Sequence, residues 1–147
     1  MRPPSIVQFE KVYIAAILVG IVNAFLSLGA MNAMLEDPTV KASGLGPGIM
    51  IFSMLIGTVV SVLLWYFIAR RASNVAKWIY VAIVAIGVWG MVSSLANPMM
   101  PKGLALIGGV IALLLQLYGA YLLFKPDAKA WLESRGTGGP GDPSAFD

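Results

Sequence analysis

The sequence predicts an all-α integral membrane protein, a four-helix bundle, and two observations lead to this fold class. Of its 147 residues, 59% are hydrophobic and 12% are charged, and soluble domains carry about twice that charged fraction. The chain also contains four long stretches without a charged residue. Each stretch is close to the ~20 residues with which a helix crosses the hydrocarbon layer of a bilayer. Water could not solvate so much apolar surface, so a lipid environment is predicted.

The uncharged stretches comprise residues 12–35, 42–69, 78–101 and 103–124. Without the turn residues at their ends, the predicted spans are residues 12–34, 50–69, 78–96 and 104–124. No stretch has the polar face of a helix in a soluble bundle, and none alternates in the manner of a barrel strand. In lipid the backbone must satisfy its own hydrogen bonds, which favours helices for all four.

Short connections with turn-forming residues join these spans. The triplet Glu36-Asp37-Pro38 ends the first span, and the glycine- and proline-rich residues 43–48 lead to the second. Residues 70–77 form the next connection, with Ser73 or Asn74 as the N-cap of the third helix. Residues 97–103 form the last one. Connections this short predict that successive helices run antiparallel and pack together.

The basic residues predict the orientation of the bundle. An N-terminus in the cytoplasm places eight basic residues on that side and two, Lys41 and Lys102, on the other. This asymmetry on short loops is the positive-inside pattern, so both termini are expected in the cytoplasm. The eight cytoplasmic residues are Arg2, Lys11, Arg70, Arg71, Lys77, Lys125, Lys129 and Arg135.

The segments outside the spans have their own signals. Ser5 and Gln8 fit a capping box, so residues 4–11 are either the first turns of the first helix or a separate amphipathic segment. Residues 126–133 predict a short cytoplasmic interfacial helix with Trp131 as its anchor. The glycine- and proline-rich residues 134–147 predict a flexible tail after a single four-span domain at residues 1–133.

The residues that most enzyme sites need are missing from the sequence. It contains no cysteine and no histidine, which excludes thiolate or imidazole ligands and an imidazole base. The spans contain no Asp, Glu, Lys or Arg, the residues that usually mark proton or ion pathways in membranes. We therefore expect no enzyme activity, no catalytic or metal-binding residue and no cofactor. Contacts with lipid, quinone or pigment stay open.

Small and neutral polar residues recur within the spans at helical spacing. They predict helix packing or partner contacts, although a polar pocket for a quinone, pigment or lipid headgroup is an alternative. The candidates for packing are Gly20, Asn23, Ser53, Gly57, Ser61, Gly90, Gly109 and Gln116. The candidates for interfacial anchors are Trp65, Trp78, Trp131, Arg70 and Arg71.

Two segments resemble each other within the chain. Residues 12–15 read VYIA and residues 79–82 read IYVA, with Gly20 and Gly87 at the same offset. A duplicated hairpin would produce such a pair. The second and fourth spans do not match at this offset, so chance similarity between apolar segments is the alternative.

Three motifs carry a resemblance to a known group of proteins. They are RPPSxxxFEKxY at residues 2–13, RRASNVAKW at residues 70–78 and LLFKPDAKAW at residues 122–131. With them, residues 1 to about 133 resemble small four-span bacterial inner-membrane proteins to which no activity is assigned. The resemblance implies a location in the bacterial cytoplasmic membrane and supplies no activity.

The function expected from these features is that of a non-catalytic accessory or assembly subunit of a larger bacterial inner-membrane complex. A respiratory or photosynthetic complex is one setting. Its partners would be membrane lipids and other membrane subunits or a second copy of itself, and no nucleic acid. The alternative is a small homo-oligomeric transporter or channel for a neutral or lipid-like solute.

Overall fold

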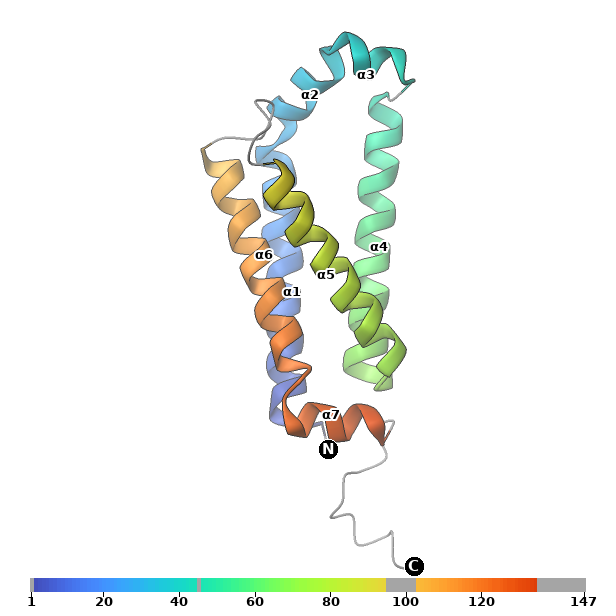
Figure 1. Cartoon of the computed structure of the whole chain (residues 1–147), viewed down its shortest axis with the longest axis vertical. Helices are drawn as coiled ribbons and strands as arrows, with labels where there is room; N and C mark the ends of the chain where they lie inside the picture. The colour runs from blue at the N-terminus through green and yellow to red at the C-terminus, as the bar shows by residue number, and fades with distance from the viewer. Residues whose placement is uncertain (1, 45, 95–102, 135–147) are drawn as a thin grey trace, which may run out of the picture.

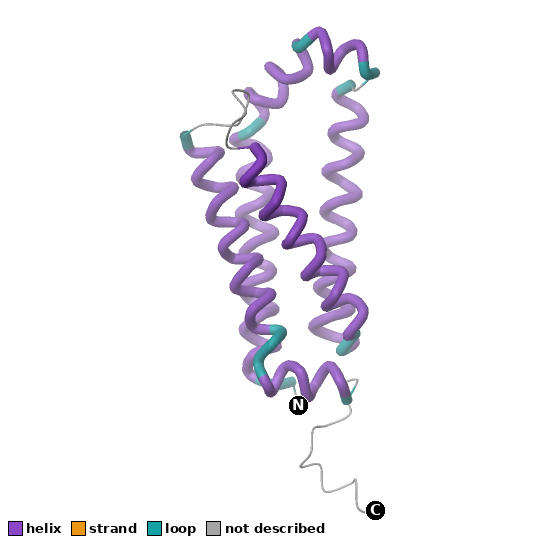
Figure 2. Tube along the Cα trace, viewed as in Figure 1, coloured by secondary structure: helices purple, strands orange, loops and turns teal. Residues whose placement is uncertain are grey.

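The computed structural model describes residues 2–44, 46–94 and 103–134, and within these residues every regular element is a helix (Figure 1; Figure 2). The four long helices are α1 (Pro4–Leu26), α4 (Pro47–Arg71), α5 (Asn74–Ser94) and α6 (Leu104–Leu122). All four are long and apolar enough to cross a membrane. The chain is therefore a multi-pass α-helical membrane protein.

Three short helices lie at the two ends of the bundle. At one end, α2 (Leu28–Glu36) and α3 (Pro38–Ala42) connect α1 to α4; we call this the α3 end. At the other end, α7 (Pro126–Glu133) runs across the bundle near the start of α1; we call this the α7 end (Figure 1). The bounds of α7 match the short helix predicted at residues 126–133, whereas its place at a membrane interface stays a prediction.

The first helix differs from its predicted form. It begins at Pro4, so residues 4–11 are its first turns and the separate amphipathic segment is wrong. Pro3 is the N-cap, and Ser5 does not cap the helix. The helix bends at Ser27, whose N–H still donates to the Asn23 carbonyl at 2.9 Å while its carbonyl accepts from Met31 at 2.9 Å. A straight helix over residues 12–34 is therefore replaced by two helices that meet at a bend.

The other helix ends follow local capping chemistry. The Ser73 hydroxyl accepts a hydrogen bond from the Ala76 N–H at 3.2 Å, so Ser73 caps α5 as one of the two expected residues. The Asp37 carboxylate accepts from the Thr39 N–H at 2.8 Å and caps α3. Helix α4 extends a few residues beyond the predicted residues 50–69. The last two residues of the predicted third span, 95 and 96, lie outside the described residues.

The hydrophobic core lies at the α7 end. Its largest fully buried side chains come from α1, α4, α7 and the end of α6, namely Ile6, Phe9, Ile68, Leu122, Leu123 and Leu132. Toward the α3 end this core is absent from α4, where every residue from 51 to 60 is exposed. Helix α1 packs most extensively on α6. Helix α4 stands apart from α1 over much of the length of α4 (Figure 1). The bundle is thus closed at one end and open between α1 and α4 at the other.

Candidate functional site

Three aromatic rings form the boundary between the closed core and the open half of the bundle. Phe9 and Tyr13 on α1 have ring centroids 5.2 Å apart. Tyr80 on α5 lies 5.8 Å from Phe9 and 5.1 Å from Tyr13. All three side chains are buried. Aromatic pairs at these separations add to the stability gained from burial, so this cluster fixes α5 against α1.

The two tyrosine hydroxyls connect neighbouring helices. Tyr13 donates a hydrogen bond to the Ser61 carbonyl of α4 at 3.0 Å. Tyr80 donates to the Gln116 carbonyl of α6 at 2.7 Å. A Cβ atom at Gly119 would lie 3.0 Å from the Tyr80 hydroxyl, so a larger residue there would be tightly packed against this phenol. Both phenols are thereby satisfied inside the bundle, as buried phenols require.

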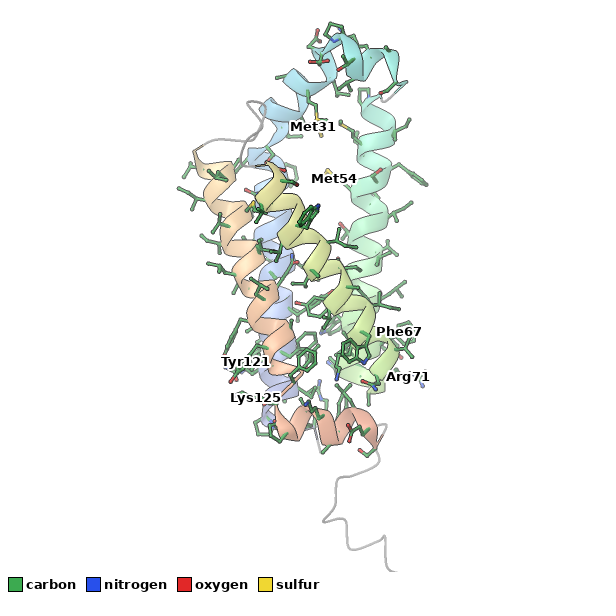
Figure 3. The ribbon with its side chains drawn as sticks, viewed as in Figure 1. Met31, Met54, Phe67, Arg71, Tyr121 and Lys125 are labelled. Atoms are coloured by element: carbon green, nitrogen blue, oxygen red, sulfur yellow. The ribbon has the colours of Figure 1, made fainter. Side chains whose placement is uncertain are left out.

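A cavity of about 670 Å³ opens above these tyrosines, between α1, α4 and α5. Its wall is mostly apolar and extends to Met31 and Met54 near the α3 end (Figure 3). The two aliphatic hydroxyls in its wall bind carbonyls of their own helix: Thr58 donates to the Met54 carbonyl at 2.9 Å, and Ser61 donates to the Gly57 carbonyl at 2.8 Å. A polar solute in this cavity would therefore meet few free hydrogen-bonding groups.

Small residues from two helices line this large cavity. Ala16, Gly20 and Ala24 of α1 and Gly57 and Ser61 of α4 all belong to its wall. A Cβ atom added at Gly20 or Gly57 would have no atom within 4 Å. The small-residue stripes predicted for close helix packing therefore meet open space here.

A second cavity of about 380 Å³ lies beside α5 and α6. Asn23, Gly90, Gly109 and Gln116 contribute to its wall. Gln116 also lines the large cavity, so its side chain stands between the two spaces. In the described part of the chain, every other polar side chain in the wall of the large cavity makes a hydrogen bond. The Gln116 amide is therefore the polar group of this wall that is most available to a ligand.

Asn23 of α1 packs closely against two glycines of α6. A Cβ atom at Gly108 would lie only 2.4 Å from the Asn23 Oδ1 atom and 3.3 Å from its Cβ atom. The Asn23 Nδ2 atom would lie 3.6 Å from a Cβ atom at Gly109. Within the described residues, the Oδ1 atom is buried without a hydrogen-bond partner. Asn23 and Gly109, both predicted as packing residues, therefore meet across one interface, and Gly108 is the tighter contact.

The structure separates the remaining packing candidates. Gly20, Gly57 and Ser61 line the large cavity, Gly90 lines the small one and Gln116 lines both. Ser53 is exposed on α4, and its hydroxyl donates to the Ile49 carbonyl at 2.8 Å. It lines neither cavity, so the structure brings it together with none of the other candidates.

An acidic residue that sequence reasoning missed joins the basic residues at the α7 end. Glu10 accepts from Arg70 of α4 at 2.9 Å and also pairs with Arg2. Arg70 lies over the Trp65 ring, with its guanidinium carbon 5.7 Å from the centroid, and Arg71 lies 5.9 Å from the centroid of a neighbouring tyrosine. Glu10 is the only acidic residue before the first span, a signal that could have identified it.

The tryptophans predicted as interfacial anchors fall into different environments. Trp78 is 55% exposed at the start of α5, as an anchor would be. Trp65 is half-buried, and its Nε1 atom is buried without a partner among the described residues. Trp131 is only 8% exposed because it packs into the core with Leu132. Trp131 thus packs α7 onto the bundle, and its role as an anchor at the membrane interface stays a prediction.

A hydrogen bond between the start of α1 and the start of α7 completes this end. The Ser5 N–H donates to the Asp127 Oδ2 atom at 3.1 Å. Burial alone would raise the pKa of Asp127, but hydrogen bonds from the backbone and side chain of Ser5 and from nearby backbone N–H groups bring this pKa below its ordinary value. The carboxylate therefore serves as an anionic acceptor for both helix N-termini.

Fold and site together define the class of this protein as an α-helical membrane protein with four candidate spans and an apolar cavity between its helices. Comparisons with protein-family models, with curated proteins and with solved structures gave no significant match.

Proposed function

We propose that this chain is a non-catalytic accessory or assembly subunit of a larger complex in the bacterial inner membrane. One observation carries the proposal: the small-residue stripes of α1 and α4 border a cavity of about 670 Å³ instead of packing against a helix of the same chain. The wall residues Gly20 and Gly57 have no atom within 4 Å of an added Cβ position.

The physics of helix association in lipid supports this proposal. Lipid removes the hydrophobic drive between helices, so close approach at small residues supplies much of their attraction. A glycine inside a helix costs about 0.5–1 kcal/mol relative to alanine, and Gly20 and Gly57 offset none of this by packing within the chain. A helix of another subunit that packed against the cavity side of α4 would cover Gly57 and the exposed residues of 51–60 that share its face.

The proposal also states which end of the bundle faces the cytoplasm and that the protein catalyses no reaction. The α7 end, with most of the basic residues, would lie in the cytoplasm, and α7 would lie along that membrane surface. The hydroxyls of the large cavity are engaged with backbone carbonyls and have no imidazole or thiolate beside them, because the sequence contains neither histidine nor cysteine. We therefore assign no chemistry to this wall.

A matched pair of glycine substitutions tests the proposal. Gly57→Leu fills the cavity wall of α4, whereas Gly48→Leu makes the same change in the first turn of α4, outside that wall. After purification from native membranes in mild detergent, the wild type and Gly48→Leu should retain larger subunits at fixed stoichiometry. Gly57→Leu should lose them and stay monodisperse. A wild-type chain that purifies alone, or equal retention by both variants, would contradict the proposal.

A second candidate function rests on Gln116. Because this residue lines both cavities, a small homo-oligomeric transporter or channel for a neutral or lipid-like solute could use its amide along the path. Flux into liposomes that Gln116→Leu abolishes would favour this function. Gln116 is a better probe than Asn23, because Asn23 also packs against Gly108.

A further inference from the structure

Two lysines converge on one aromatic ring at the α7 end. The Nζ atom of Lys77, at the start of α5, lies 4.8 Å from the ring centroid of Phe124 and 5.3 Å from that of Trp78. The Nζ atom of Lys129 on α7 lies 5.9 Å from the same Phe124 ring. The two rings contact each other edge to face at 5.8 Å. Both ammonium groups therefore lie close to the same phenyl ring.

Their charge is not balanced by an ion pair. Lys77 is only 6% exposed, yet in the described part of the chain no carboxylate lies within 4.0 Å of Lys77 or Lys129. Glu133 acts on Lys77 only as a more distant attraction. Two other carboxylates of the α7 end have partners of their own, since Glu10 binds arginines and Asp127 accepts from Ser5. A buried cation with a like charge beside it is costly unless an anion joins it.

We propose that Lys77 and Lys129 bind the phosphate group of an anionic phospholipid. Phosphate oxygens would accept hydrogen bonds from both ammonium groups and balance their charge. Lys125, between α6 and α7, is a further basic group of the α7 end, with its Nζ atom 5.9 Å from the Tyr121 centroid (Figure 3). The rings carry the apolar side of the site, because Trp78 and Phe124 are both exposed.

The surroundings favour a lipid over a free anion. The site lies where α5 begins and α6 ends, and exposed apolar side chains, Ile79 and Leu117 among them, occur along both helices. Acyl chains of a bound lipid would contact these apolar side chains. A soluble phosphate compound has no acyl chain and would gain nothing from them. The site does not depend on the accessory-subunit function or on the orientation, because its lysines and rings all belong to this chain.

Lipid retention by the full-length protein tests the site. Native mass spectrometry would compare dioleoyl phosphatidylglycerol with dioleoyl phosphatidylcholine, which has the same chains and no net charge. We expect the wild type to bind the anionic lipid more tightly. Lys129→Gln and Lys77→Gln should each weaken this binding about fivefold, the effect of one basic residue near a membrane surface. Lys11→Gln removes an exposed charge from α1 without touching the rings and should leave binding unchanged.

Other results would overturn the site. Equal binding of the two lipids, or equal weakening by Lys11→Gln and Lys129→Gln, would show a general surface charge effect. Displacement of the lipid by millimolar inorganic phosphate would show a site for free anions. If Lys77→Gln does not fold, the exposed Lys129 decides the outcome alone, because its replacement leaves the core intact.

Discussion

The Tyr13 hydroxyl on α1 donates a hydrogen bond to the Ser61 carbonyl on α4 at 3.0 Å. Both residues lie in the wall of the large cavity. Nearer the α7 end, α4 is held by the core and by the Arg70–Glu10 ion pair. Beyond Ser61, toward the α3 end, residues 51–60 of α4 are exposed. This hydrogen bond therefore marks the level at which α4 leaves the bundle.

Loss of this hydrogen bond should loosen α4. Tyr13→Phe keeps the ring contacts and removes the donor, so we expect a destabilisation of about 0.6–1.7 kcal/mol, the range for hydrogen bonds between membrane helices. Tyr121→Phe is the control, because the described residues show no hydrogen bond from its exposed phenol. Equilibrium unfolding in mixed detergent micelles measures the difference. Equal stability of the two variants would contradict the importance of this contact.

A methyl group at Gly108 should disturb the interface between α1 and α6. Gly108→Ala would place a Cβ atom 2.4 Å from Asn23 Oδ1 and 3.3 Å from its Cβ atom. The amide can rotate away but the Cβ atom cannot, so overpacking should cost about 1 kcal/mol or more. Gly20→Ala is the control because its site is open, and it should stabilise by about 0.5–1 kcal/mol through helix propensity. The same unfolding assay compares them.

A double mutant separates steric conflict from other effects of Gly108→Ala. In an Asn23→Gly background the conflicting side chain, including its Cβ atom, is gone, so Gly108→Ala should become neutral or stabilising. A Gly108→Ala penalty that persists in this background would show that Asn23 is not its cause.

The sequence predicted the four spans because charged residues are absent from four stretches that are long enough to cross the hydrocarbon layer of a bilayer. It did not predict the bend at Ser27, since no proline or charged residue marks that position and the hydrogen bonds continue through it. Ser5 and Gln8 satisfied a capping pattern, yet Pro3 precedes the helix and Gln8 donates to the Tyr118 hydroxyl at 2.8 Å instead. Local patterns do not contain such tertiary partners.

The candidate site was less predictable than the fold. Small-residue spacing identified Gly20 and Gly57 as packing residues, but spacing does not specify whether a helix of this chain or open space lies opposite. The internal similarity between residues 12–15 and 79–82 gave no sign that Tyr13 and Tyr80 would meet with centroids 5.1 Å apart. Trp131 fitted an interfacial anchor by composition, although α7 turns it into the core. Each of these outcomes depends on the arrangement of helices in space.

The attachment of α7 should weaken in acid. Since hydrogen bonds hold the folded-state pKa of Asp127 below its ordinary value of 3.8, the carboxylate contributes stability above that value, and this contribution disappears as the pH falls through the lower folded-state pKa. In a variant with the other three tryptophans replaced by Phe, Trp131 emission should shift to the red over this range. The same variant with Asp127→Asn should lack that transition. An identical acid transition with Asn at this position would assign the effect to another group.

Single cysteines test the four-span arrangement most directly, because the chain has no cysteine of its own. Lys41→Cys reports on the α3 end, while Arg71→Cys and Glu133→Cys report on two helices at the α7 end. With a membrane-impermeant maleimide on intact cells, we predict labelling of Lys41→Cys alone and labelling of the other two only after the membrane is opened. Labelling of Arg71→Cys and Glu133→Cys from opposite faces, or of all three from the same face, would contradict the four-span bundle with its α7 end in the cytoplasm.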